Sequence, residues 1–318
     1  MRILSKAKLF TAVLVATLAL MISFASFADH PNLVITAQDV VEMRASIDGN
    51  GRFAKAYQAQ KARVDQQLTL PIAVPVPKDG GGGYTHEQHK RNAAMILQAG
   101  MLFQFSGERA YADLCRDLLL AYAGLYPTLG EHPQKKEQTP GRLFWQSLNE
   151  AVWLVTAIQG YDAIYESIAE NERRAIEQGL LRPLADFLSQ GQPQTFDKIH
   201  NHGTWAVAAV GMTGFVLEDP GYVEMALYGL KRDGSAGFMR QLDELFSPDG
   251  YYSEGPYYQR YALMPFVLFA QAIERNEPQR RIFEYRDGIL PKAIDTTIQL
   301  SYNGLFFPIN DAIKDKGL

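Results

Sequence analysis

The densest polar chemistry in the chain lies at residues 198–205, Lys-Ile-His-Asn-His-Gly-Thr-Trp, which lead directly into the apolar segment 206–217. A segment that is apolar on all sides is typical of a buried helix. The amide of Asn201 can donate to an anionic oxygen, and His202 can transfer a proton near neutral pH. Because the start of a helix favours a bound anion, these residues predict an anion site at which a proton can move.

A simpler explanation is that Asn201 caps the helix and that His202 lies beside it by chance. The residue types alone do not decide between a cap and a site. Lys198 and His200 favour a site, since four polar groups are more than a cap requires.

Residues 247–261, Ser-Pro-Asp-Gly-Tyr-Tyr-Ser-Glu-Gly-Pro-Tyr-Tyr-Gln-Arg-Tyr, have the same design, because they also open a long apolar helix. Packing with the hydroxyl at a wet surface explains most such tyrosines. One tyrosine can instead be a proton donor, since a phenol with a pKa of ~10 suits the return of a proton to a departing sugar oxygen. Arg260 would stabilise the resulting phenolate. Alternatively, Asp249 and Glu254 form the acid–base pair of a glycosidase, or serve only in a turn and at a helix start.

We predict that these two helix mouths form one active site. Two further residues are candidates on weaker grounds. Lys136 lies in a polar loop and can hold a carboxylate. Gln146 lies beside Trp145 on a predicted helix, 143–164, and can face a cleft.

The sequence predicts no metal or cofactor site in this chain. His86 and His89 are three residues apart, but only Glu87 lies near them, so a metal site is not favoured. The four glycines at 80–83 lack the spacing of a phosphate-binding loop, and the common hydrolase, zinc-protease and dinucleotide motifs are missing. The single cysteine, Cys115, lies in an apolar helix and is predicted to be an inert core thiol.

Apolar residues spaced three and four apart dominate the chain and predict helices. A capping-box-like pattern at Thr36 begins the first helix, and the proline-rich segment 71–77 predicts an extended connector. The predicted helices cover residues 36–47, 53–68, 86–105, 108–126, 143–164, 171–188, 202–217, 222–232, 234–246, 256–275 and 289–300, with a strand at 296–298 as an alternative.

The predicted fold is therefore all-α, built of antiparallel helix hairpins joined by short turns, without a repeat of fixed length. Such hairpins can close into a toroid whose inner helices converge on a cleft, while an open solenoid and a bundle are the alternatives. We expect one domain over residues 29–318. The apolar, extended segment 305–312 makes no compact finish, so we expect the chain to be the N-terminal part of a longer protein.

Residues 1–28 have the features of an export signal. Three basic residues precede an apolar core, 9–22, and small residues at positions 26 and 28 predict cleavage before Asp29. A membrane anchor is the alternative, but the apolar run is short for a span of ~20 residues. We expect a periplasmic or secreted protein without stable membrane insertion after cleavage.

The charge balance limits the class of partner. Loss of three positive charges with the signal would move the formal net charge from −4 to about −7. This balance argues against nucleic acid, which binds basic surfaces, and means that an anionic substrate must be held by local cations. The oligomeric state stays open, with a homodimer as one candidate.

Residues 200–205, His-Asn-His-Gly-Thr-Trp, and 249–258, Asp-Gly-Tyr-Tyr-Ser-Glu-Gly-Pro-Tyr-Tyr, resemble the two signature segments of the alginate lyase and heparinase II/III-like superfamily. The similarity is greatest to the oligoalginate lyases of polysaccharide lyase family 17 and extends over the predicted mature chain. It implies an incomplete (α/α) toroid followed by a β-sandwich domain that this chain does not contain. The missing domain would supply another catalytic histidine and tyrosine, and a structural metal.

The resemblance also implies roles for three residues here. Asn201 and His202 would neutralise a uronate carboxylate, and Tyr258 would act as catalytic acid and also as a candidate base. The residues expected to bind the substrate are Lys136, Gln146, Tyr251, Tyr257, Arg260 and Tyr261.

The expected function is exolytic β-elimination of alginate oligosaccharides, with the exolytic mode implied by the family alone. The sequence leaves three alternatives. They are a heparinase-type lyase on another uronic-acid glycan, a toroid glycoside hydrolase that uses Asp249 and Glu254, and a non-catalytic glycan-binding protein.

Overall fold

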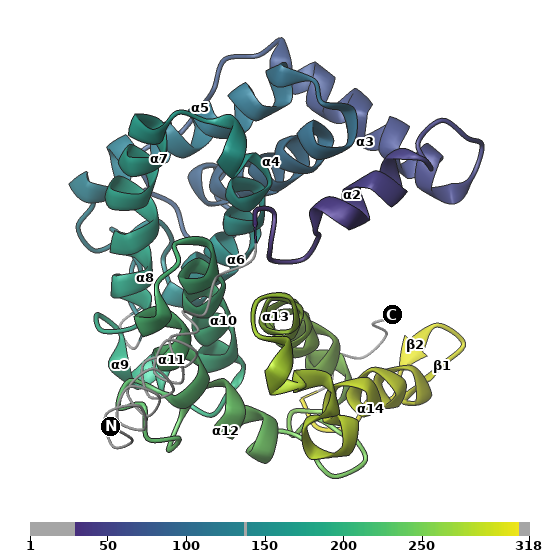
Figure 1. Cartoon of the computed structure of the whole chain (residues 1–318). Coiled ribbons are helices and arrows are strands. Elements are labelled where there is room, and N and C mark those ends of the chain that lie inside the picture. Colours follow the sequence, from purple (N-terminus) through teal and green to yellow (C-terminus); the bar gives the residue numbers. More distant parts are fainter. Residues whose placement is uncertain (1–28, 137–138, 312–318) are drawn as a thin grey trace, which may run out of the picture.

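The computed structural model of the chain describes residues 29–136 and 139–311 (Figure 1). The predicted export signal, 1–28, lies outside these residues and stays a prediction. Within the described part, no helix combines the length and apolar character needed to cross a bilayer.

The described chain is nearly all helical, as predicted. Its α-helices are α2 (Ala37–Arg44), α3 (Arg52–Leu68), α4 (Tyr84–Ser106), α5 (Arg109–Leu125), α6 (Ser147–Ile164), α7 (Glu170–Ile176), α8 (Arg182–Leu188), α9 (Pro193–Phe196), α10 (Asn201–Val216), α11 (Pro220–Tyr228), α12 (Gly237–Glu244), α13 (Pro256–Asn276) and α14 (Tyr285–Gln299). The described strands are β1 (Ser301–Tyr302) and β2 (Leu305–Phe306), which pair antiparallel as a hairpin.

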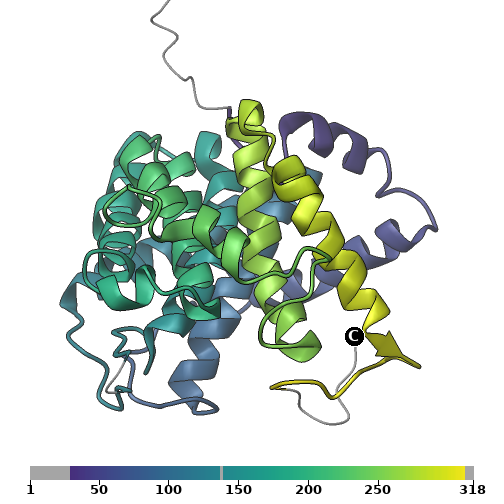
Figure 2. The same ribbon diagram turned by 90° about the horizontal axis from the view of Figure 1, so that it is seen from below.

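The helices follow one another around an incomplete (α/α) toroid, from α3–α5 through α6–α8 and α10–α12 to α13 and α14 (Figure 1). After a turn of 90°, α13 and α14 lie side by side near the purple helices α2 and α3 (Figure 2). Arg275 links α13 to the N-terminal segment of the described chain. Its guanidinium donates a hydrogen bond to Val34 O at 3.1 Å and forms an ion pair with Asp39 at 2.8 Å.

Helix α10 occupies the middle of the core. Every residue of α10 except His202 is buried, which confirms the prediction of a buried helix behind a polar mouth. It packs against α6, α11 and α13, and an apolar surface on all sides requires such neighbours. The polar residues at its start can therefore face only a cavity or other polar groups.

Several predicted boundaries are wrong, and each error has a local cause. Residues 143–146 are not helical, because the buried carboxylate of Glu150 binds the backbone N–H groups of residues 142–144 and holds them in a loop. Gln146 is therefore the N-cap of α6 and not a residue on the helix. The predicted helices 222–232 and 234–246 are shorter, because Gly229, Gly234 and Gly237 adopt positive φ.

The remaining predictions of local structure are partly confirmed and partly wrong. The capping box at Thr36 is confirmed, with Asp39 as its acidic partner. The predicted helix 171–188 contains a π-helical segment, η3 (Glu177–Leu181), between α7 and α8. The alternative strand at 296–298 is wrong, because these residues belong to α14, whose regular part begins after Gly288. The short helix α9 was not predicted.

We predict that the thiol of Cys115 is unreactive in the native protein. It is fully buried, and burial raises the pKa of the thiol, so little thiolate reaches solvent. An alkylating reagent at mildly alkaline pH should label Cys115 only after denaturation. A Ser235→Cys variant, which adds an exposed thiol, should gain one rapid label. Rapid labelling of the parent protein would contradict the core packing.

Candidate active site

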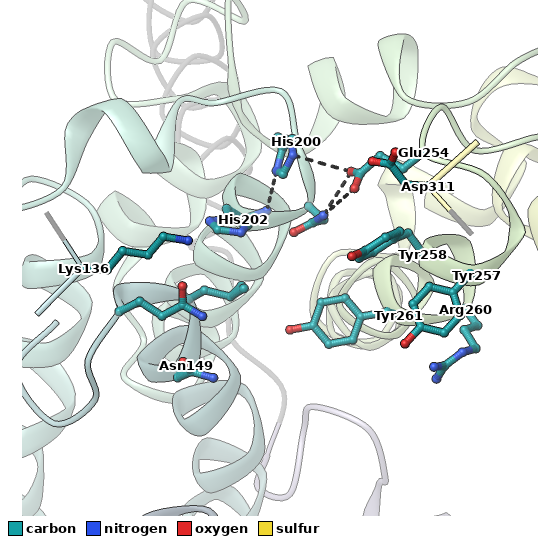
Figure 3. Close-up of a pocket in the computed structure, with 13 residues that line it drawn as sticks. Lys136, Asn149, His200, His202, Glu254, Tyr257, Tyr258, Arg260, Tyr261 and Asp311 are labelled. Atoms are coloured by element: carbon teal, nitrogen blue, oxygen red, sulfur yellow. Dashed lines mark hydrogen bonds and ion pairs between the residues drawn. The ribbon is translucent and has the colours of Figure 1, made fainter. Parts of the chain in front are cut away.

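A cavity of about 540 Å³ lies where the starts of α10 and α13 face the loop before α6 (Figure 3). The two helix mouths therefore meet, as the sequence predicted. The residues that line the cavity are Lys136, Gln146, Leu148, Asn149, His200, Asn201, His202, Glu254, Tyr257, Tyr258, Arg260, Tyr261 and Asp311.

Tyr251 is the predicted substrate-binding residue that the structure does not place in this lining. Its hydroxyl accepts a hydrogen bond from Asn310 Nδ2 at 2.9 Å, and its backbone N–H donates to Ser247 Oγ at 3.0 Å. Tyr251 thus shapes the turn before α13, and the structure does not support a place for it in the cavity wall.

The mouth of α10 differs from the simple cap considered above. His200 is the N-cap, with an extended backbone and an Nδ1 that accepts the N–H of His202 at 3.3 Å. Gly203 is required here, since a Cβ would lie 2.0 Å from the carbonyl oxygen of Lys198. Because His200 takes the capping position, the amide of Asn201 does not cap the helix, and the partners of its described hydrogen bonds lie inside the site.

Those partners belong to Glu254, which the sequence offered only as a glycosidase acid or a helix-start residue. Asn201 Nδ2 donates to both carboxylate oxygens, at 2.8 and 3.0 Å. The hydroxyl of Tyr252 donates to Oε1 at 2.9 Å, and His200 Nε2 lies 3.8 Å away. One carboxylate thus joins the two helix mouths.

The mouth of α13 depends on Gly255. Its φ of 90° and the carbonyl oxygen of Ile309, 2.5 Å from where a Cβ would stand, leave room only for glycine. The turn directs the first turn of α13 to the cavity, where Tyr258 and Tyr261 share a face because they are three residues apart. Figure 3 shows their hydroxyl groups pointing toward the middle of the site, opposite Lys136.

The aromatic rings of α13 are held by their neighbours. Tyr257 packs edge-on against Tyr258, with ring centroids 5.2 Å apart, and the guanidinium of Arg260 lies 4.7 Å from the centre of the Tyr257 ring. The ring of Tyr261 packs against that of Trp205 of α10, with ring centroids 5.2 Å apart. Burial raises the pKa of Tyr261 to about 12, so this phenol keeps its proton at neutral pH.

Gln259 is fully buried and fixes the turn that carries Glu254. Its Nε2 donates to the carbonyl oxygens of Gly250 and Ala293, at 2.8 and 2.9 Å, and its Oε1 accepts the N–H of Tyr252 at 3.3 Å. One amide thereby ties α13, α14 and the turn together.

His202 is electrically neutral at pH 7. Burial lowers the pKa of its imidazole to about 4, and the positive charges of Lys198 and Lys136, with His200, add to this effect. A neutral imidazole can accept a proton and can also donate an N–H to an anion. The local positive potential also favours an anionic ligand.

The opposite wall is the loop that leads to α6. The N–H of Lys136 donates to Trp145 O at 2.8 Å, and the ammonium lies 5.9 Å from the centre of the Trp145 ring. Glu150 anchors the base of this loop, since its buried Oε1 accepts three backbone N–H groups. The loop presents Lys136 and Gln146 to the cavity.

Sequence reasoning missed two polar lining residues, Asn149 and Asp311, and the joining role of Glu254. A signal existed for two of them. Glu254 lies inside the second motif, and Asn149 follows Gln146 by three residues, on the first turn of α6. Asp311 carries no comparable signal, because only tertiary contacts bring it to the site.

In the described ranges, no group of three or more His, Cys, Asp or Glu side chains could hold a metal ion. His89 is buried and bonded to the Tyr122 hydroxyl at 2.8 Å. The absence of a cofactor in this chain remains a prediction.

The geometry defines a class of protein. It is an (α/α) toroid in which two polar helix mouths and several phenols line one cavity. The chain belongs to the Alginate lyase family, whose profile matches residues 42–305.

Two curated relatives match most of this chain. An exo-oligoalginate lyase from Saccharophagus degradans is 62% identical over 289 residues, which are 91% of this chain and 39% of the relative. An alginate lyase from Stenotrophomonas maltophilia is 56% identical over 291 residues, with 92% and 39% covered. The chain thus spans about two fifths of the length of these relatives.

Solved structures share the fold at low sequence identity. An alginate lyase from Bacteroides ovatus has a TM-score of 0.62 and 10% identity, covering 85% of this chain and 83% of that one. Alginate lyase A1-III from Sphingomonas species A1 has a TM-score of 0.55 and 16% identity, covering 86% and 82%. These similarities establish the toroid.

We predict that Glu150→Ala destabilises the protein by about 3 kcal/mol or more, because three backbone N–H groups, two of them buried, lose their acceptor. Glu150→Gln keeps an acceptor oxygen and should cost less. Burial raises the pKa of Glu150 from 4.5 to about 7, so between these values the folded state binds more protons than the unfolded state. The free energy of unfolding should therefore fall with rising pH in the parent protein relative to Glu150→Gln. Urea titrations from pH 4 to 8 measure both effects, and an unchanged difference between the two proteins would refute the assignment.

We also predict that His202 titrates near pH 4 in the free protein. Lys136→Met removes one nearby positive charge and should raise this pKa, whereas Lys231→Met, on the exposed surface, should leave it unchanged. NMR titration of the histidine rings measures both. A pKa of His202 at its ordinary value near 6.5 in the parent protein would show that burial and the cations do not act as described.

Proposed function

We propose that the protein is a lyase that cleaves alginate oligosaccharides by β-elimination from a chain end. The observation that carries this proposal is a single cavity that joins Asn201 and His202, at one helix mouth, with Tyr258 at another. The names of both curated relatives support alginate as the substrate, and the name of the Saccharophagus relative supports exolytic action. A variant of alginate lyase A1-III complexed with a tetrasaccharide supports an oligosaccharide in this fold.

The first step is removal of the proton at C5 of a uronate, next to the carboxylate. The carbanion-like state becomes accessible only when preorganised donors neutralise the carboxylate charge. Asn201 and His202 stand at the start of α10, where the helix dipole adds to their effect. Lys136, across the cavity, contributes a positive charge.

In the second step the electrons of the C5–H bond form a C4=C5 double bond, and the C4–O bond breaks with its electron pair on the departing oxygen. The hydroxyl of Tyr258 then protonates that oxygen. Two groups remain candidates for the base that takes the C5 proton, namely the neutral imidazole of His202 and a tyrosine, including Tyr258 itself.

The remaining lining residues are proposed to bind an acidic oligosaccharide and not nucleic acid. Lys136 and Arg260 supply positive charge, Gln146 supplies an amide, and Tyr257 and Tyr261 offer rings and hydroxyls to the sugars. The proposed steps use side chains alone. Export by residues 1–28 would place the enzyme in the periplasm or outside the cell.

The geometry argues against the glycosidase alternative. Asp249 is exposed, accepts a hydrogen bond from the hydroxyl of Ser247 and does not line the cavity. Glu254 does line it, but its carboxylate already accepts hydrogen bonds from Asn201 and Tyr252. The two acids therefore do not face each other across a substrate site.

We predict that the full-length protein, incubated with alginate oligosaccharides, raises the ultraviolet absorbance of a new C4=C5 double bond. Tyr258→Phe should lower this rate by a factor of about 100 or more, since a general acid contributes 10²–10⁴-fold. Tyr302→Phe, at a residue of β1 that is 78% exposed, and Asp249→Asn should both retain the parent rate.

Heparin and chondroitin serve as comparison substrates in the same assay. Absorbance with these glycans and not with alginate would indicate the heparinase-type alternative. New reducing ends without the ultraviolet rise would indicate a hydrolase, and binding without either product a glycan-binding protein. Full activity of Tyr258→Phe would remove Tyr258 from the acid role.

A further inference from the structure

We infer that Glu254 is a positioning residue that holds the amide of Asn201 in the orientation needed to bind the substrate carboxylate. This inference rests on the proposed function and adds to it a residue that does not itself touch the reacting atoms. The starting observation is a contradiction. A site proposed for an anionic sugar contains a carboxylate, whose charge would repel that sugar if it faced the cavity unpaired.

The contacts of Glu254 resolve this contradiction. Its side chain is 17% exposed, and its two oxygens accept from Asn201 Nδ2 at 2.8 and 3.0 Å and from the Tyr252 hydroxyl at 2.9 Å. His200 Nε2 lies 3.8 Å from Oε1 of the same carboxylate. In Figure 3 a dashed line joins His200, at the start of α10, to Glu254. The negative charge is thus directed to protein donors.

The effect on Asn201 follows from the geometry of its amide. An asparagine amide has two N–H donors, and both acceptor oxygens belong to one carboxylate on one side of Nδ2. One N–H bond therefore serves Glu254, and the other stays available for a ligand. Because a hydrogen bond to a charged acceptor is stronger than a neutral one, Glu254 fixes which way the amide of Asn201 points.

The orientation of the Asn201 amide depends on a contact between two separate segments of the chain. Asn201 begins α10, whereas Glu254 lies in the turn before α13, which the buried amide of Gln259 holds in place. Other charged groups of the site, Lys136 and Asp311, have no hydrogen bond with Asn201 among the described contacts. Glu254 is thus the group whose removal should release the Asn201 side chain.

The test is a double-mutant cycle in the full-length protein, with unsaturated product from alginate oligosaccharides as the readout. Glu254→Ala should lower kcat by about 10–100-fold, the range typical of residues that orient a first contact, while KM changes by less than about threefold. In the Asn201→Ala background the same substitution should lower kcat by less than about threefold, because the group that it orients is gone.

Conservative and matched variants separate positioning from folding. Glu254→Gln keeps a carbonyl oxygen that can accept from Asn201, so it should recover most of the lost kcat. Glu244→Gln, at an acid of α12 paired with Arg240 on the surface, should have the parent rate. An equal loss from Glu254→Ala in both backgrounds, or no recovery by Glu254→Gln with an unchanged melting temperature, would overturn the inference.

A second readout does not need activity. In the parent protein the Nδ2 protons of Asn201 should give a well-dispersed pair of NMR signals, one of them slow to exchange with solvent. Glu254→Ala should collapse this dispersion, and Glu254→Gln should preserve it. If the parent protein forms no unsaturated product, the proposed function fails, and these signals alone decide whether Glu254 orients Asn201. Unchanged signals in Glu254→Ala would refute the inference.

Discussion

The burial of α10, complete apart from His202, is the constraint on which the rest of the structure depends. A helix with no exposed face must be enclosed by others, and α6, α11 and α13 do so. Its first turn cannot be enclosed in the same way, because unpaired backbone N–H groups and polar side chains require partners. The polar residues at that end therefore open into a cavity, and the toroid provides one where α13 also begins.

The cavity contains both positively and negatively charged side chains. The neutral imidazole of His202 and the ammonium of Lys136 favour an anionic ligand in the cavity. The carboxylate of Glu254 already accepts hydrogen bonds from donors of the protein. Partial burial of His202 and Glu254 strengthens their interactions, since charges are less screened inside a protein. The same arrangement would let a chain with a net negative charge hold the proposed acidic sugar at one place on its surface.

Burial also explains which supports hold the site. The amide of Gln259 and the carboxylate of Glu150 lie far from each other in the sequence, yet each bonds several backbone groups of a loop beside the site. Burying a polar side chain costs free energy, and these hydrogen bonds offset that cost. Both side chains therefore define loop shape, and through it the positions of Tyr258 and Gln146.

The sequence by itself determined the all-α class, the buried helix after residue 205 and the two polar helix mouths, because apolar spacing and clustered polar residues are local properties. The tertiary structure decided what local patterns cannot contain. Gln146 occupies the N-cap position of α6 because Glu150 holds the preceding residues in a loop, and Glu254 accepts from Asn201 across 53 positions of sequence. For the same reason Tyr251 does not line the cavity, since its hydroxyl accepts a hydrogen bond from Asn310, which lies 59 positions away in the sequence. Which polar side chains meet depends on how the helices close around α10, and that closure is decided by packing over the whole chain.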